Sequence, residues 1–503
     1  MAPTELQFIV STGQESTSSR DRKLIRRHVM KGKNLGKQRP LGSKQFRESQ
    51  QQLPPPNSEQ ATVEHVHIAP ISLDRDGCFN GLVSTSIPRD SFPGHSTMTL
   101  ADTVKPEVFK IVLELSSISK KLLFALEPCM FFDRRAEHWV APLATDPAYL
   151  HVSVFSALYF YGVLVSQNTS IPTQLSWYHY KKALSLLHER LQHDDDRIRL
   201  SNSTLNTILT FVGHAFTAGD LVSAKNHLEG MRRVIDLKGG WSTLEGNEKL
   251  ITEILRADLG MTLHTGDESV FISHSTGNWP YPNMSVFLNQ PRSQSRGLCD
   301  ETRSAATKFG IEPKSNLGTA LHAMSEFCSV INLACETKQR ISVRMYLDSM
   351  ASIMYRLLNM RFDDCSRHET IRLGLLCFSC GVFLQWQNIG MSYLHLTSIV
   401  RQRFMEHFAA QSTLDFRKSN LWLLMTSAVA LLGQSNETWW QPLIKRAMKD
   451  CKVESWAETR EIISSLMWIG VLHDQQGARI VDMVQAVAQP IEPFSLLTQP
   501  IAL

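Results

Sequence analysis

The fold class of the chain is decided by residues 220–240, DLVSAKNHLEGMRRVIDLKGG. Apolar side chains recur in this stretch at steps of three and four residues, which places them on one face of an α-helix. They are Leu221, Ala224, Leu228, Met231 and Ile235. Asp220 stands where an N-cap side chain accepts from the free amides of the first turn, and Gly239 follows the last periodic residue, where glycine commonly ends a helix. The stretch predicts an amphipathic helix with Leu228 and Met231 buried.

The same period continues on both sides of this stretch. Trp177, Tyr180, Leu184, Leu187 and Leu191 follow the same steps, which predicts a second helix with these side chains on one face. Further helices are expected at 107–126, 146–165, 201–216, 246–263, 315–336, 341–360, 368–386, 391–409, 414–432, 437–450 and 456–473. No window alternates with a period of two for long enough to predict a sheet. The sequence therefore predicts an all-α fold, either a multi-helix bundle or a short α-solenoid of antiparallel helix pairs.

Three windows are more apolar than the rest of the chain: residues 149–165, 371–386 and 421–433. Two of them carry His151 and Arg372, and the third falls well short of the roughly 20 apolar residues that span a bilayer. They are expected to be buried helices of a protein with no membrane partner.

The composition changes along the chain and predicts three regions. Residues 1–48 form a basic N-terminal arm that is expected to be disordered. Residues 49–103 contain SQQQLPPPNS and much Pro, Gly and Ser, which predicts a disordered linker. Residues 104–503 are expected to form one helical regulatory domain. An irregular loop at 265–300, marked by GNWPYPN and QPRSQSRG, is expected to interrupt it.

Charge is segregated between the arm and the rest of the chain. Lys and Arg number 52 and Asp and Glu 48, so the net charge of +4 gives no overall field that would drive the chain onto nucleic acid or an anionic membrane. Residues 20–47 carry eleven basic side chains against one Asp, a net charge of +10 that leaves −6 for the remainder. A basic surface that binds a partner is therefore expected in the arm alone.

Three interpretations of the basic arm are open. Its densest charges, with a few apolar residues between them, suit a nuclear import signal that a receptor reads in an extended segment. They also suit weak, non-specific contact with nucleic-acid phosphates, which depends on counterion release. The third interpretation is a solvating basic tail. The candidate contact residues are Arg26, Arg27, Lys31, Lys33, Lys37 and Arg39.

The cysteines and the motif content indicate no catalytic or metal site. The nine cysteines are scattered through apolar segments, which is typical of reduced core residues in a cytosolic or nuclear protein. Cys377 and Cys380 have the spacing of half a zinc site, but zinc takes four ligands and no second pair lies nearby. No G-x-S-x-G, H-E-x-x-H or G-x-G-x-x-G occurs. The sequence predicts a protein that is not an enzyme and needs no cofactor.

A helical terpene-synthase-like enzyme with degenerate metal motifs is one alternative. Asp363 and Asp364 imitate an aspartate-rich motif, but Arg367 stands where a third carboxylate is expected. Gly219, Ser223 and His227 imitate the spacing of the second motif, with a ligand residue only at the middle position. Because Mg²⁺ requires near-octahedral oxygen ligands, these sets predict little affinity for it. A cytosolic scaffold is another alternative.

A resemblance to a known family lies within the stretch 220–240. The positions that carry it are Ala224, His227, Gly230, Gly239 and Gly240. With the apolar run before the two glycines, they resemble the fungal-specific transcription factor domain, the helical middle homology region of fungal regulators. Residues 150–162 and 177–191 resemble the helices that precede this motif, and residues 252–258 resemble the helix that follows. Typical members begin with six closely spaced cysteines that hold two zinc ions, whereas residues 1–77 contain no cysteine.

The resemblance implies a transcription regulator in the nucleus that lacks its own zinc-cluster DNA-binding module. It would control a fungal biosynthetic or metabolic gene cluster, such as one of secondary metabolism, through protein contacts of its helical body. Other transcription regulators and an import receptor are the expected partners. Homo- and heterodimers both stay open at this point.

Overall fold

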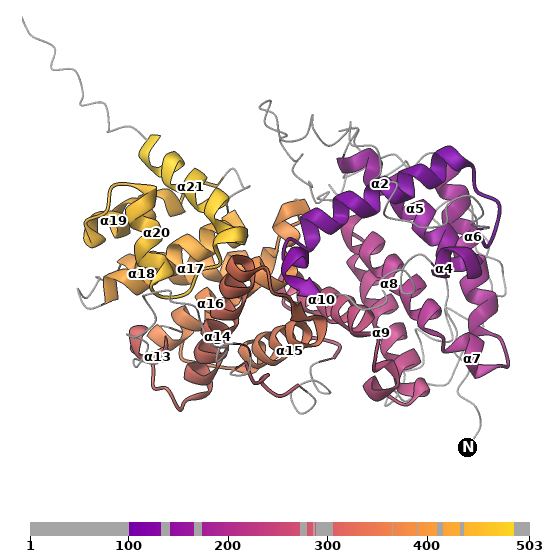
Figure 1. Cartoon of the computed structure of the whole chain (residues 1–503), viewed down its shortest axis with the longest axis horizontal. Helices are drawn as coiled ribbons and strands as arrows, with labels where there is room; N and C mark the ends of the chain where they lie inside the picture. Colours follow the sequence, from indigo (N-terminus) through magenta and orange to yellow (C-terminus); the bar gives the residue numbers. More distant parts are fainter. Residues whose placement is uncertain are drawn as a thin grey trace, which may run out of the picture.

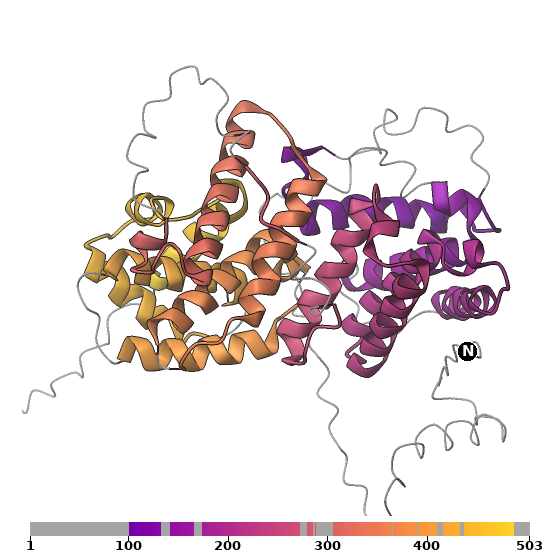
Figure 2. The ribbon, with the colours of Figure 1, turned by 90° about the horizontal axis from the view of Figure 1, so that it is seen from below.

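The structure is a computed structural model that describes residues 100–131, 141–164, 174–271, 279–284, 287, 305–364, 366–389, 391–409, 416–432 and 437–486. In these ranges the chain is all-α apart from two short strands, which confirms the predicted fold class. The helices form two groups joined near the middle of the molecule (Figure 1). We call them the N-terminal lobe and the C-terminal lobe. Figure 2 shows the two lobes side by side when seen from below.

The N-terminal lobe contains the helices that precede residue 245. They are α2 (Pro106–Leu123), α4 (Ala141–Thr145), α5 (Pro147–Leu164), α6 (Gln174–Leu191), α7 (Asp196–Arg199), α8 (Asn202–Thr217), α9 (Leu221–Lys238) and the 3-10 turn η3 (Trp241–Leu244). Helix α5 packs against α2, α6 and α8, and α9 packs against α8. Because only 218–220 connect α8 and α9, the two run antiparallel as a hairpin.

The C-terminal lobe contains the helices after residue 304. They are α13 (Ala305–Lys308), α14 (Asn316–Thr337), α15 (Val343–Asn359), α16 (Arg367–Ser379), α17 (Leu394–Ala409), α18 (Arg417–Ser427), α19 (Trp440–Cys451), α20 (Trp456–Ser464) and α21 (Gly470–Ala486). The π-helical turn η4 (Cys380–Leu384) continues α16, the 3-10 turn η5 (Trp386–Ile389) follows it, and the π-helical turn η7 (Ala428–Leu432) continues α18. Helix α18 contacts α16, α19 and α20, so it lies at the centre of this lobe.

Helix α10 (Glu248–Thr265) joins the two lobes. It contacts α8 on one side and both α15 and α17 on the other. A second link is a parallel pair of two-residue strands, β1 (Met130–Phe131) after the 3-10 turn η2 (Glu127–Cys129) and β2 (Ile341–Ser342) before α15. Segments far apart in the sequence therefore hold the lobes together.

Helix α9 forms as the sequence predicts. The Asp220 side chain accepts from the Ser223 amide at 3.0 Å, and Gly239 adopts the left-handed conformation with φ of 111°. Leu228 and Met231 are 1% and 0% exposed, which confirms both as core residues. The helix buries one stripe and leaves the opposite face in solvent.

The predicted apolar face of α6 is buried at Leu187 and Leu191 but not at Trp177. Trp177 is 41% exposed, whereas Ser176, His179 and Ala183 are buried. His179 turns toward the lobe because its Nδ1 lies 2.8 Å from Nδ1 of His151 on α5. Tyr180 and Leu184 are partly buried against the core, so the apolar stripe packs on the lobe from Tyr180 to Leu191 and departs from the packed face at Trp177.

Helices α16 and α18 are buried on all sides, as their apolar windows predict. Every residue from 369 to 379 and from 419 to 427 is buried. One ion pair lies in this core: the Arg372 guanidinium donates to Glu369 at 2.5 and 2.7 Å and to the Leu357 carbonyl at 2.9 Å. Such pairing is what lets a charge stay away from water. Within the described ranges, every helix is too short or too polar to cross a lipid bilayer.

The prediction of a single helix at 456–473 is wrong. Helix α20 ends at Ser464 and α21 begins at Gly470. Four successive side chains between them are buried: Leu466, Met467, Trp468 and Ile469. A helix that packs by one face cannot bury four neighbours in a row. Here the backbone leaves the helix and its carbonyls accept side-chain donors, from Trp422 Nε1 to Met467 at 2.5 Å and from Asn332 Nδ2 to Trp468 at 2.8 Å.

Part of the predicted loop at 265–300 packs on the body. Phe271, Trp279 and Met284 are 1%, 3% and 1% exposed. The buried carboxylate of Asp258 on α10 accepts from the amide of Val270 at 2.8 Å and from the hydroxyl of Tyr355 at 2.7 Å. Burial raises the pKa of this carboxyl. Residues 266–271, which follow α10 and are not helical, are therefore linked to α15 through Asp258.

Candidate functional site

The residues of the family-like motif lie in the hairpin of α8 and α9. Ala224 and Gly230 are buried in α9, which packs against α8. The ring of His227 stacks on Phe211 of α8 with centroids 5.8 Å apart, and burial lowers its pKa. Gly239 and the following Gly240 end the helix, with the Gly240 amide donating to the Ile235 carbonyl at 2.9 Å. In the structure this motif is a packing unit.

The six candidate residues of the basic arm lie outside the described residues, as do residues 1–99 as a whole. The described residues begin at Leu100, which lies inside the predicted linker. The last linker residues contact the body: the Ala101 amide donates to the Leu143 carbonyl at 3.1 Å.

The two motifs that imitate a magnesium site have structural partners instead. Asp364 pairs with Arg403 of α17 at 2.6 Å. The Arg367 guanidinium lies 3.4 Å from the ring centre of Phe416 and donates to Ser419 at 3.0 Å. Within the described ranges, no three His, Cys, Asp or Glu side chains gather in a way that could hold a metal ion.

The Cys377 and Cys380 pair lies in the core of the C-terminal lobe. Both residues are 0% exposed. Burial raises the pKa of the Cys377 thiol to about 12 and that of Cys380 well above its usual value. Since the thiolate is the form that binds metals and attacks disulfides, these are packing residues.

A chain of ionisable groups, which the sequence did not reveal, connects the segment before α2 with α5 and α6. Its two histidines are buried, and Asp102 is partly exposed. The His151 ring stands between Asp102 Oδ2, 3.1 Å from its Nε2, and His179 Nδ1, 2.8 Å from its Nδ1. Burial and the neighbouring His151 lower the pKa of His179 to about 4. The hydrogen bond with His151 lowers the pKa of Asp102. The chain anchors the start of the helical body to the N-terminal lobe.

One sizeable cavity, which we call the junction cavity, lies where the lobes meet. Its volume is about 280 Å³, and its walls come from α2, α5, α8, α10 and the segment around η5. The large apolar side chains in the wall are Leu115, Phe160, Leu209, Phe216, Met261 and Trp386. The indole of Trp386 packs against α10 at Gly260, where an added Cβ would come within 1.9 Å of the ring. Glycine is therefore required at this position for the wall to form.

Arg256 of α10 is the buried charge in the wall of the junction cavity. It is 2% exposed. Its Nη2 donates to the carbonyls of Leu123 at 3.0 Å and of Leu384, which end α2 and η4. Its Nη1 lies 3.5 Å from the carboxylate of Glu253, and the guanidinium lies 4.5 Å from the ring centre of Phe124. The Nε of Arg256 is buried and makes no hydrogen bond within the described part of the chain.

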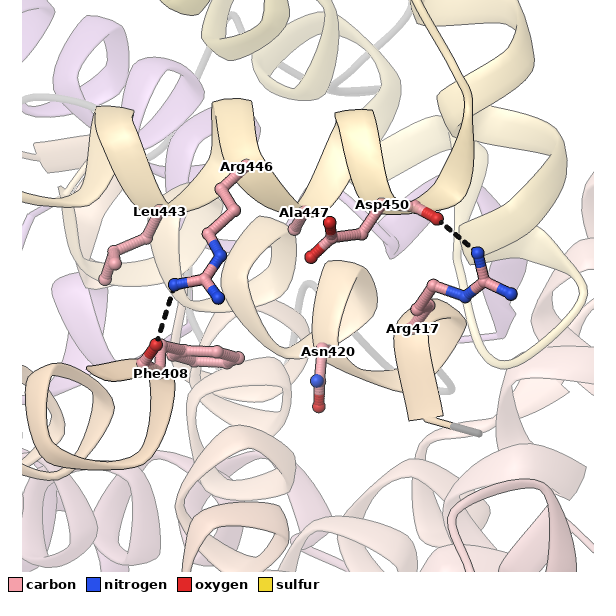
Figure 3. A pocket seen from close by; sticks show the side chains of 7 residues that line it. All are labelled: Phe408, Arg417, Asn420, Leu443, Arg446, Ala447 and Asp450. Carbon is pink, nitrogen blue, oxygen red and sulfur yellow. Dashed lines mark hydrogen bonds between the residues drawn. The ribbon is translucent and has the colours of Figure 1, made fainter. Parts of the chain in front are cut away.

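A second hollow, in the C-terminal lobe, is too small to hold a ligand. It lies between α17, α18 and α19 and has a volume of about 20 Å³. As Figure 3 shows, Arg446 donates to the Phe408 carbonyl at 3.3 Å and Arg417 to the Asp450 carbonyl at 2.9 Å. A water molecule needs roughly 10–15 Å³ of such space, so this hollow holds about one water. It is a gap in helix packing that two arginines close.

These features define the class of the protein as an all-α, multi-helix protein with a cavity between its two lobes. Comparison of the chain with family models, with curated proteins and with solved structures gave no match.

Proposed function

We propose that the chain is a nuclear regulator of transcription that acts through protein contacts of its helical body and has no zinc-cluster module of its own. The observation that carries the proposal is the segregation of charge: residues 20–47 hold a net charge of +10 and the remainder −6. A basic arm joined to a mildly acidic helical body suits a protein that is imported into the nucleus and then binds other proteins.

The helical body offers features that suit protein contacts. At the start of α6, Leu175, Trp177 and Tyr178 are 39%, 41% and 56% exposed. Aromatic side chains are enriched in the buried centres of protein interfaces. The resemblance of the α8 and α9 region to the fungal-specific transcription factor domain supports the same role, with a biosynthetic or metabolic gene cluster as the target.

A genome-wide chromatin-occupancy map, paired with transcript levels in a deletion strain, tests this proposal. The expected result is occupancy at a set of neighbouring genes whose transcripts change when the gene is deleted. Other transcription regulators are expected to be required for this occupancy, because a basic arm alone binds DNA at roughly 10⁻⁴–10⁻⁶ M.

Absence of occupancy together with unchanged transcripts would contradict the proposal. A protein found only in the cytosol, with unchanged transcripts in the deletion strain, would favour a scaffold. Thermal stabilisation of the purified chain by millimolar Mg²⁺ would instead favour an enzyme, because a ligand that binds the folded state raises the melting temperature.

A further inference from the structure

The junction cavity has the size of a small-molecule site. An engineered protein cavity of roughly 150 Å³ binds benzene, so a volume of about 280 Å³ accommodates a ligand about twice that size. A bicyclic aromatic compound or a chain of about eight carbons fits this range. Most of the wall is apolar, which is typical of pockets for small organic molecules.

Polar groups are confined to a few points of the wall. The hydroxyls of Thr210 and Thr217 donate to backbone carbonyls of their own helix, at 3.0 and 2.9 Å, so they are engaged. The Arg256 guanidinium is directed to two backbone carbonyls and to Glu253, and its Nε is shielded from a water-sized probe, so this side chain closes the wall and is not a contact for a ligand. Ser119 of α2 and Ser156 of α5 also line the cavity, and their hydroxyls are the polar groups that a ligand oxygen can meet there.

Charge in the wall favours a neutral ligand. The Glu253 carboxylate lines the same cavity as Arg256 and lies 3.5 Å from its Nη1. Because this carboxylate and two backbone carbonyls already face the guanidinium, an anionic ligand would meet like charge at a short distance. A hydroxyl or carbonyl oxygen can hydrogen-bond to a serine hydroxyl of the wall without this repulsion.

From these observations, we propose that the junction cavity is a binding site for an uncharged, largely apolar molecule with a single hydroxyl or carbonyl oxygen. The oxygen hydrogen-bonds to the hydroxyl of Ser119 or Ser156, and the apolar part lies against Phe160, Phe216 and Trp386. The inference goes beyond the proposed role in transcription and does not depend on it, because it concerns binding by the purified chain. The walls come from both sides of α10, so the ligand contacts the two lobes at once.

Gly213 of α8 provides a way to close the cavity without disturbing the fold. It lies in the wall and is exposed, and a Cβ added there meets no atom within 4 Å. Glycine inside a helix is less favourable than Ala or Leu, so both substitutions at this position also favour the helix. Gly213→Leu is expected to place its side chain across the mouth of the cavity, and Gly213→Ala is the matched control that leaves most of the volume.

Binding is measured on the full chain with 1-aminonaphthalene, a bicyclic apolar probe whose fluorescence emission shifts to shorter wavelength when it leaves water. The expected result is saturable binding to the natural chain, retained within about twofold by Gly213→Ala and weakened at least tenfold by Gly213→Leu. Both variants should melt at or above the natural temperature. 1-Octanol should displace the probe at concentrations at least tenfold lower than octanoate.

Equal probe binding by the natural chain and Gly213→Leu would overturn the proposal, as would the absence of saturable binding to the natural chain. Stronger displacement by octanoate than by octanol would overturn the choice of a neutral ligand. If Gly213→Leu fails to fold, Ser156→Leu narrows the cavity from α5 and should weaken probe binding in the same way. The chromatin map reports on transcription and is independent of each of these outcomes.

Discussion

Helix α9 of the N-terminal lobe and helix α18 of the C-terminal lobe bury their side chains in different ways. Helix α9 packs by one stripe and leaves Val222 73% exposed on its other face. Helix α18 has all residues from 419 to 427 buried, with Trp422 among the largest fully buried side chains. The apolar period of α9 can be recognised from the sequence, and this helix can shift as a unit because one of its faces is in solvent. Helix α18 is buried on all sides, so it cannot move to accommodate a changed side chain. Substitutions should therefore be most damaging in the C-terminal lobe.

The largest effect is expected for Trp422→Ala. The Trp422 ring packs against Phe309 and Phe378, with centroids 5.0 and 5.4 Å away, and its Nε1 donates to the Met467 carbonyl. Loss of a fully buried aromatic side chain costs about 3–5 kcal/mol, and the orphaned carbonyl adds to this. Chemical denaturation should show this loss as a lower free energy of unfolding. The control is Trp177→Ala, which changes a 41% exposed residue and should cost less than about 1 kcal/mol. Equal losses would contradict the contrast between the lobes.

A somewhat smaller loss is expected for Leu228→Asp in α9. Leu228 is 1% exposed, so the substitution places an unpaired carboxylate in the core at a cost of about 3 kcal/mol, less whatever α9 regains by shifting toward water. Val222→Asp, in the same helix at an exposed position, is the control and should leave the melting temperature nearly unchanged. Unchanged melting of Leu228→Asp would remove α9 from the core.

Acid is expected to destabilise both lobes through buried histidines. Burial lowers the pKa of His179 and His214 in the N-terminal lobe, and of His473 in the C-terminal lobe, to about 4. The ordinary pKa is about 6.5, so between these values the unfolded chain binds protons that the folded chain does not. The stabilisation is complete above pH 6.5 and is lost as the pH falls toward 4.

The contribution of one of these histidines can be isolated in the C-terminal lobe. His473 is 2% exposed, and its neutral ring should account for about 2 kcal/mol of the stability lost between pH 7 and pH 5. His473→Phe keeps a ring against Phe378 and Trp468 and should show a loss smaller by that amount in denaturation measured at both pH values. An unchanged pH dependence would show that His473 does not stay neutral in the fold.

The smallest change in stability is expected for substitutions of Gly213 and Gly239 in the α8 and α9 hairpin. One substitution should stabilise the protein and the other should destabilise it. Gly239 has φ of 111° and an added Cβ would lie 3.2 Å from Thr243, so Gly239→Ala should destabilise by about 1 kcal/mol. Gly213→Ala, inside α8 with open space around it, should stabilise by up to about 1 kcal/mol. Melting curves of both variants give the comparison, and shifts of the same sign would contradict it.

Helix positions in this protein can be predicted from sequence where local signals suffice. Asp220 and Gly239 mark the ends of α9 because their contacts lie within a few residues, and the apolar windows of α16 and α18 indicate their burial. The break between α20 and α21 cannot be predicted in this way, because it depends on donors from Trp422 and Asn332, distant in the sequence. The burial of His179 on α6 cannot be predicted in this way either, because it depends on the contact with His151 of α5.

The candidate site also combines one feature that can be predicted from the sequence with one that cannot. The basic arm is visible in the sequence as a run of charge. The junction cavity is not visible in this way, because its walls come from five elements that lie far apart in the sequence, and no local pattern connects Leu115 with Trp386. Arg256 reads in the sequence as one charge on an amphipathic helix, and only the fold shows that it is buried between the ends of α2 and η4.

The central claim, that the arm brings a regulatory helical body into the nucleus, is tested most directly by transcript levels in a rescue experiment. Replacement of Arg26, Arg27, Lys31 and Lys33 by Ala should exclude a fluorescent fusion from the nucleus and abolish expression of the target genes. A foreign import signal added to this variant should restore both. Restored nuclear entry without restored expression would contradict a role limited to import and would favour direct contact of the arm with nucleic acid. A fusion that stays nuclear despite the four substitutions would contradict the role of the arm altogether.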